Sequence, residues 1–201
     1  MAAMAEPAKV SRDPGSARSE LFALQVEQHQ HDETYHREIA RLSLHQRLNH
    51  MALHFAKYTG KIAVADDPTA LSAVYVDVLV IALSTANVVN VELFDLLERD
   101  GRDFPGLLPF ARSLAASMQN VIGDRYALLR DTTIASGRMA AACEKIDHLE
   151  EISFRAEIRD CVAQLSSIAL AFLSSNGIDP MEAVRDRLGR VKKRLKLHGR
   201  I

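Results

Sequence analysis

The sequence predicts an all-α fold, and three observations support this prediction. Of the 201 residues, 48% are apolar and only 5% are aromatic, and tryptophan is absent. Alanine, leucine and arginine recur throughout, and the apolar residues repeat with a helical period without a convincing strand. The length suits one globular domain or two small ones, with enough apolar surface for a core. A disordered chain is therefore excluded.

The apolar period and the turn signals together predict six helices. They cover residues 17 to 31, 34 to 65, 68 to 98, 107 to 149, 154 to 175 and 180 to 197. The fourth helix contains Gly123, where we expect an interruption. A break over residues 100 to 106, which contains glycine, proline and charged residues, is the predicted boundary between two halves of the chain.

Two helix starts have clear local signals. Asp67 is placed to cap the helix that begins with Pro68, because proline is tolerated in the first turn, where its missing N–H costs no hydrogen bond. Asp179 and Pro180 repeat this arrangement at the last helix, and Gly177 is typical of the end of the helix before it. These turns are therefore predicted independently of the apolar period.

The N-terminal residues, the most apolar helix and the number of cysteines indicate where in the cell the protein resides. Residues 1 to 17 predict a flexible N-terminal arm without the basic and apolar regions of a secretion signal. Residues 70 to 91 approach the length of a membrane span, but Asp77 and polar residues at one-turn intervals favour a helix buried in protein. Cys143 and Cys161 are too few for a disulfide framework, so we expect a cytoplasmic protein with no membrane partner. Cys143, next to three alanines, fits a small packed residue.

The charge balance gives no general indication of a polyanionic partner. Lysine and arginine number 25 against 26 aspartate and glutamate residues, for a formal charge of −1. Whole-chain electrostatics therefore favour neither nucleic acid nor an anionic membrane. The chain also lacks the glycine-rich motifs that bind phosphate and the common hydrolase motifs.

The two halves share an order of elements, namely a long helix, a turn and a buried helix with an aspartate near its start. Asp77 occupies this position in the first half and Asp160 in the second. We therefore expect an internal duplication, with 18–103 and 104–201 as its two copies.

Four carboxylates in the second half form a candidate metal site. Glu144 and Asp147 lie three residues apart on one helix, and Glu157 and Asp160 repeat that spacing on the next, so each pair shares a helix face. A turn near residues 151 to 153 would make the helices antiparallel and bring the pairs together. Because four clustered carboxylates repel one another, they would need a hard divalent cation, which suggests Mg²⁺ or Mn²⁺. The alternative is two solvated helix faces.

The chain resembles the MazG-like all-α nucleoside triphosphate pyrophosphatases in the order of three features. These are the acidic pairs, the segment Asn176-Gly-Ile-Asp-Pro-Met-Glu-Ala-Val and the basic last helix. The resemblance covers residues 137 to 196, with residues 44 to 98 as a weaker second copy. It implies a bundle of two helix-pair repeats, a pseudo-dimer within one chain, that assembles further as a homo-oligomer.

The resemblance also implies an activity. The four carboxylates would hold Mg²⁺ or Mn²⁺, with Glu144 and Glu157 as the catalytic pair, and the metal would activate water to split a nucleoside triphosphate into a monophosphate and pyrophosphate. The chain departs from the family pattern at Cys143 and Asp147, where glutamate is usual, and at Val191, near a common phosphate-binding asparagine. These departures favour an alternative, a non-catalytic helical nucleotide-binding or assembly protein that keeps the fold.

The first copy has lost most of the acidic ligands. The positions that match the metal ligands hold His54, Lys57, Val74 and Asp77. We expect the Lys57 ammonium to occupy the place of the metal and to pair with Asp77, so that the buried helix carries no uncompensated charge. The alternative is an exposed Lys57, with Asp77 bonded elsewhere.

The last helix has a basic stripe beside its apolar seam. Arg187, Arg190 and Arg194 are suited to bidentate phosphate contacts and are the candidate substrate-binding residues. A solvated helix face near a C-terminus is the alternative interpretation. The positive charge continues into a tail without the aromatic residues that would favour nucleic acid, at Lys192, Lys193, Lys196, His198 and Arg200.

A second polar cluster lies near the N-terminus. Its members could ligate a transition metal or could form a solvated helix end, and they are His29, His31, Asp32, Glu33 and His36. His148, beside the acidic pairs, is a further candidate for substrate contact.

Overall fold

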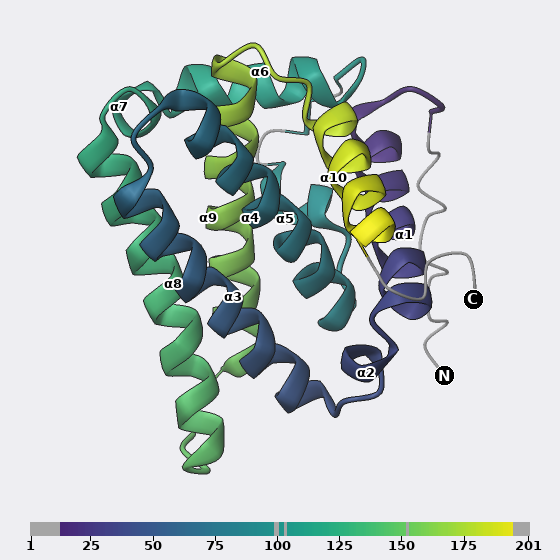
Figure 1. The fold of residues 1–201 in the computed structure, drawn as a ribbon, viewed down its shortest axis with the longest axis vertical. Helices are drawn as coiled ribbons and strands as arrows, with labels where there is room; N and C mark the ends of the chain where they lie inside the picture. The colour runs from purple at the N-terminus through teal and green to yellow at the C-terminus, as the bar shows by residue number, and fades with distance from the viewer. Residues whose placement is uncertain (1–12, 99–100, 103, 152, 195–201) are drawn as a thin grey trace, which may run out of the picture.

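The computed structural model describes residues 13–98, 101–102, 104–151 and 153–194, and Figure 1 shows their arrangement. The helices are α1 Ala17–Tyr35, α2 Arg37–Ala40, α3 Leu44–Val64, α4 Pro68–Val88, α5 Leu93–Leu97, α6 Leu107–Ser117, α7 Gln119–Ile122, α8 Arg125–Asp147, α9 Phe154–Ser175 and α10 Pro180–Arg194. The described residues contain no strand, so the predicted all-α class is confirmed.

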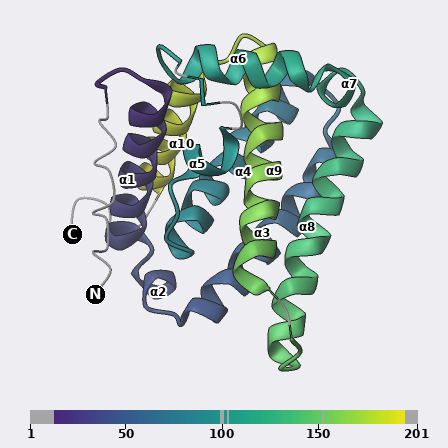
Figure 2. The same ribbon diagram turned by 180° about the vertical axis from the view of Figure 1, so that it is seen from behind.

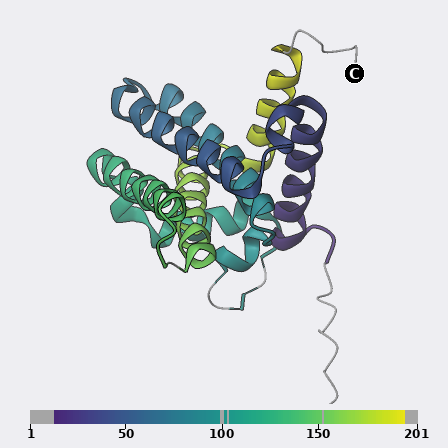
Figure 3. The ribbon, with the colours of Figure 1, turned by 90° about the horizontal axis from the view of Figure 1, so that it is seen from below.

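Four long helices form the centre of the molecule. α3 packs on α4, α4 on α9, α9 on α8 and α8 on α3, so that two helix pairs face each other. Viewed from below, α3 and α8 lie on one side, and α1 and α10 lie together on the other (Figure 3). α6 crosses one end of α9 (Figure 2). One cluster of buried apolar residues includes members from both predicted halves, which therefore share a core.

α4 is the most apolar element of the core. It is the one described helix that is by itself long and apolar enough to cross a membrane, but 67% of its most apolar window is buried inside the molecule. α9 and α10 pass the same test only as a pair, and they meet at an angle of 105°. Contacts with α1, α3, α9 and α10 surround α4, as the prediction of a helix buried in protein requires.

The predicted helix starts are present. The Asp67 side chain accepts a hydrogen bond from the Ala70 N–H at 2.8 Å, and Pro68 is the first residue of α4. Asp179 likewise accepts from the Met181 N–H at 2.8 Å. Gly177, with a φ of +72°, follows the end of α9 in the left-handed conformation that favours glycine.

Three predicted helices are divided in the structure. The helix predicted for residues 17 to 31 extends to residue 35. The helix predicted for residues 34 to 65 is divided, because α3 begins only after Ser43, which forms a capping box with Gln46. Asn90, with a φ of +55°, separates α4 from α5. The predicted interruption near Gly123 is found, and Asp124 caps α8 directly after it. These breaks depend on local capping, which is weaker in the sequence than the apolar period.

The end of the predicted N-terminal arm belongs to a packed helix. Residues 1–12 lie outside the described part, and so do residues 99, 100 and 103 near the predicted boundary. Ser16 already caps α1 by accepting from the Ser19 N–H at 3.2 Å, and Ala17 is fully buried. The arm prediction was therefore wrong for residues 16 and 17, because they begin a packed helix.

Two contacts attach α1 to the segment before α6. The Ala17 N–H donates to the Phe104 carbonyl at 3.0 Å, and Glu20 Oε2 accepts from the Leu107 N–H at 2.6 Å. Gly106 has a φ of +108°, and a Cβ atom there would lie 3.3 Å from Glu20 Oε2. The positive φ therefore favours glycine at this position, and any other side chain would also displace Glu20 slightly.

Candidate functional site

Arg138 on α8 bridges the acidic pair of α9. Its Nη2 atom lies 2.9 Å from Glu157 Oε2 and 3.8 Å from Asp160 Oδ2. The side chains of Glu157 and Asp160 are 38% and 69% exposed. The charge of this pair is therefore partly neutralised by a cation of the protein itself.

The acidic pair of α8 lies farther along the bundle. Glu144 Oε1 is 3.9 Å from His148 Nε2, and Asp147 Oδ1 is 3.2 Å from His45 Nε2. Arg138 is level with Glu157. Glu144 and Asp147 come six and nine residues after Arg138, so they lie roughly 9 and 14 Å farther along the axis of α8. α8 thus carries its acidic pair past the start of the neighbouring α9.

The four carboxylates do not form one ligand cluster. Among the described residues, three potential ligand side chains have ligand atoms that all lie within 4.8 Å of one another. None of the four carboxylates belongs to this group. The turn between α8 and α9 occurs where predicted, with Leu149 at a φ of +57°. Because α8 continues to Asp147 before this turn, the pairs are offset along the axis. Their role in holding Mg²⁺ stays a prediction.

The basic stripe of α10 is split between the interior and the surface. Arg187 turns inward, where its Nε–H donates to Asp77 on α4, and the two side chains are 25% and 12% exposed. Arg190 and Arg194 are exposed. The part of the predicted tail in residues 195–201 lies outside the described residues.

Lys57 does not pair with Asp77. Its Nζ atom donates to His54 Nδ1 at 2.9 Å and lies 4.6 Å from the centre of the Tyr58 ring. Asp77 pairs with Arg187 instead, so the alternative in which Asp77 is bonded elsewhere is correct. The sequence could not indicate this partner, because Arg187 lies 110 positions away.

A cavity of about 270 Å³ lies beside this ion pair, among α1, α3, α4 and α10. Its lining includes His54, Lys57 and Asp77, three of the residues at the positions expected to match the metal ligands in the first half of the chain. Its polar walls contain three basic side chains, two aspartates and four histidines, which are Lys57, Lys61, Arg187, Asp32, Asp77, His31, His36, His50 and His54.

His54 is the centre of a hydrogen-bonded row along α3. Its Nδ1 atom is 2.9 Å from Lys57 Nζ and 3.3 Å from the Tyr58 hydroxyl, and its Nε2 atom is 3.1 Å from His50 Nε2. Since an ammonium group can only donate, Nδ1 is an acceptor and the neutral ring carries its proton on Nε2.

The cavity is electropositive around this row. Burial, and then the charge of Lys57 and the neighbouring His50, lower the pKa of His54 from 6.5 to about 4. Burial and the charge of Lys61 also lower the pKa of Lys57, against the raising effect of Asp77. The larger part of both shifts comes from burial, which disfavours charge of either sign, and the smaller part comes from the neighbouring positive charge, which would attract an anion.

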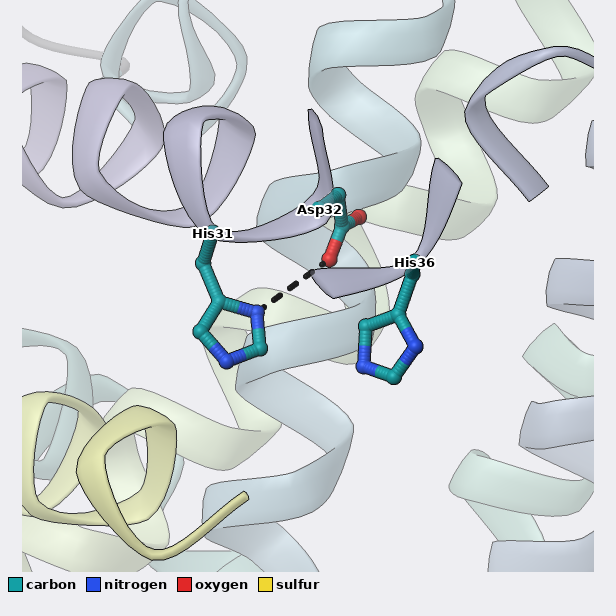
Figure 4. A group of neighbouring side chains, drawn as sticks. All are labelled: His31, Asp32 and His36. Atoms are coloured by element: carbon teal, nitrogen blue, oxygen red, sulfur yellow. Dashed lines mark ion pairs between the residues drawn. The ribbon is translucent and has the colours of Figure 1, made fainter. Parts of the chain in front are cut away.

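At the other end of the cavity, His31, Asp32 and His36 are the three residues whose ligand atoms lie within 4.8 Å of one another. His31 and Asp32 lie near the end of α1, and His36 lies at its junction with α2. In Figure 4 the two imidazole rings lie on the same side of the chain, with the Asp32 carboxylate between them. The sequence favoured a solvated helix end over a metal site for these residues. The burial of His31, which is 9% exposed, is inconsistent with a solvated helix end.

A larger cavity, of about 690 Å³, lies beside the acidic pair of α9. Arg138 and Asp160 form part of its wall, together with residues of α5 and α6. The two cysteines are not part of it; both are buried and free, and burial raises their pKa values to about 11. This agrees with the predicted packing role of Cys143.

Comparison of the chain with protein-family models, with curated proteins and with solved structures finds no match.

Proposed function

We propose that this protein binds a phosphate-bearing small molecule of the nucleotide class in the cavity between α3, α4 and α10, without hydrolysing it. The observation that carries the proposal is the positive wall of the cavity. Lys57 and Lys61 line it, and neither has a carboxylate ion-pair partner among the described residues. Arg187 lies beside them and shares its charge with Asp77.

The lack of turnover follows from the same residues. The positions expected to hold metal-binding carboxylates carry His54 and Lys57, whose nitrogen atoms are hydrogen-bonded to each other. A basic side chain in that place attracts phosphate directly and repels Mg²⁺. The packing of α3 and α4 against α8 and α9 supports the proposed duplication, in which this copy has changed from a metal site into an anion site.

Ligand-dependent thermal unfolding tests this proposal. We expect nucleoside mono-, di- or triphosphates to raise the unfolding midpoint without added metal, because a ligand that binds only the folded state stabilises it. The double variant Lys57→Met/Lys61→Met should lose this rise. The control Lys145→Met, at an exposed lysine of α8, should keep it. A rise of equal size in both variants would refute the assignment of the site.

A second candidate is the Mg²⁺-dependent nucleoside triphosphate pyrophosphohydrolase that the resemblance implies. The observation in its favour is the 690 Å³ cavity beside Asp160 and Arg138. Release of pyrophosphate from a panel of nucleoside triphosphates, with Mg²⁺ or Mn²⁺, tests this candidate. Activity that disappears in Glu157→Gln would establish it, whereas no release from any nucleotide would exclude it.

A further inference from the structure

We propose that His31, Asp32 and His36 form a binding site for a divalent first-row transition metal at the α1–α2 end of the 270 Å³ cavity. One potential ligand atom from each residue lies within 4.8 Å of the others, so small rotamer adjustments would bring all three to one ion. Two imidazoles, which are borderline ligands, together with one carboxylate suit Zn²⁺, Fe²⁺ or Co²⁺ better than Mg²⁺.

The buried ring of His31 is the independent observation that points to a ligand. Its side chain is 8% exposed, and neither of its ring nitrogens has a hydrogen-bond partner among the residues that the structure describes. Nδ1 lies 3.6 Å from Asp32 Oδ1, which is too long for a hydrogen bond. A buried imidazole without partners is costly, and a metal ion bound to one nitrogen would remove part of that cost.

Asp32 is held in the orientation that a ligand needs. Its Oδ2 atom accepts hydrogen bonds from Gln28 Nε2 at 2.5 Å and from Ser84 Oγ at 2.9 Å. Oδ1 is therefore the oxygen that faces His31. Such outer partners are typical of metal sites, because they fix the orientation of the ligand.

The break between α1 and α2 places the third ligand. In an unbroken helix, residues 31, 32 and 36 would lie at about 0°, 100° and 140° around the axis. At His36 the backbone leaves the helix, with a φ of −130° and a ψ of 44°. The rings of His31 and His36 then lie 5.5 Å apart, centre to centre. Three protein ligands leave positions open toward the cavity, where water or a ligand oxygen can bind.

Titration with the metal alone tests this site, so its outcome does not depend on nucleotide binding. We expect chelator-treated protein to bind one Co²⁺ with the visible absorption of a nitrogen- and oxygen-ligated ion, and one Zn²⁺ by calorimetry. His36→Ala should weaken both by at least about tenfold, because removal of a ligand costs no less than removal of its outer partner. The control His29→Ala, at an exposed histidine of α1, should bind as the wild type does.

Two further variants make the test decisive. Asp32→Asn keeps the shape of the side chain, so a loss of binding with unchanged circular dichroism would show that the carboxylate charge is needed. His50→Ala examines the competing pair His50 and His54, whose Nε2 atoms are 3.1 Å apart. Loss of metal in His50→Ala with full binding in His36→Ala would overturn the proposal, and so would the absence of binding in the wild type.

Discussion

The stability of this protein should fall in mildly acidic solution because His54 is held neutral. The ring faces His50, Lys57 and Tyr58 on its own helix, and Asp77 on α4 also acts on it. Its pKa is about 4 in the folded protein, against an ordinary value of 6.5. The unfolded chain therefore takes up a proton below pH 6.5 that the folded chain refuses until about pH 4. Stability is lost as the pH falls through this window.

The size of this loss follows from proton linkage. Between pH 6.5 and pH 5, one group that is protonated only in the unfolded state costs about 2 kcal/mol at most. His54 is partly exposed, so solvent screening reduces this figure to about 1 kcal/mol. Other groups titrate in the same range, and a comparison with a variant that lacks the ring removes their contribution.

His54→Gln is the suitable variant, because an amide keeps one donor and one acceptor in the row. Urea unfolding of both proteins at pH 7 and at pH 5 gives two losses of unfolding free energy. We expect the loss to be smaller in the variant by about 1 kcal/mol. Equal losses in the two proteins would refute the reasoning, and a larger loss in the variant would show that His54 is protonated more readily in the folded state.

Three further predictions concern the fold and are checked by urea unfolding at pH 7. Asp67→Ala should cost about 1 kcal/mol, since it removes the cap of α4, and no change would mean that the cap is dispensable. Tyr75→Phe should cost about 1 kcal/mol through loss of the buried 3.0 Å bond to Thr132; a stabilised variant would contradict that role. Gly106→Ala should cost about 1–3 kcal/mol because of its positive φ and the nearby Glu20.

The helices and their main turns could be predicted from the sequence because their signals are local. The residues that start α4 and α10 act on backbone groups two or three positions away, so the sequence contains the whole interaction. The other divisions were less predictable. The polar run around residues 28 to 38 indicated a break, but the sequence placed it between residues 31 and 34 and the structure places it at His36. At Asn90 the apolar period continues, and the break depends on how the next segment packs.

The candidate site was only partly predictable for a related reason. The sequence pointed to His54, Lys57 and Asp77 as one group of positions, and these residues do line a cavity. The ion pair in its wall joins Asp77 to Arg187 across 110 positions, and only the tertiary structure brings them together. A local signal was also overlooked. His50, His54 and Tyr58 recur every four residues, which places three polar rings on one face of α3.

The attachment of α10 has a consequence for exchange between the cavity and solvent. Only Pro180, Val184 and Leu188 of this helix are buried, and its ion pair with α1, between Arg185 and Glu27, lies at the surface. Detaching α10 also breaks the ion pair between Arg187 and Asp77, which is largely buried, but it leaves the four central helices packed and therefore requires less free energy than unfolding them. For the proposed ligand, the residence time would then depend on how often this helix detaches, and salt, which weakens the surface pair with Glu27, should shorten it.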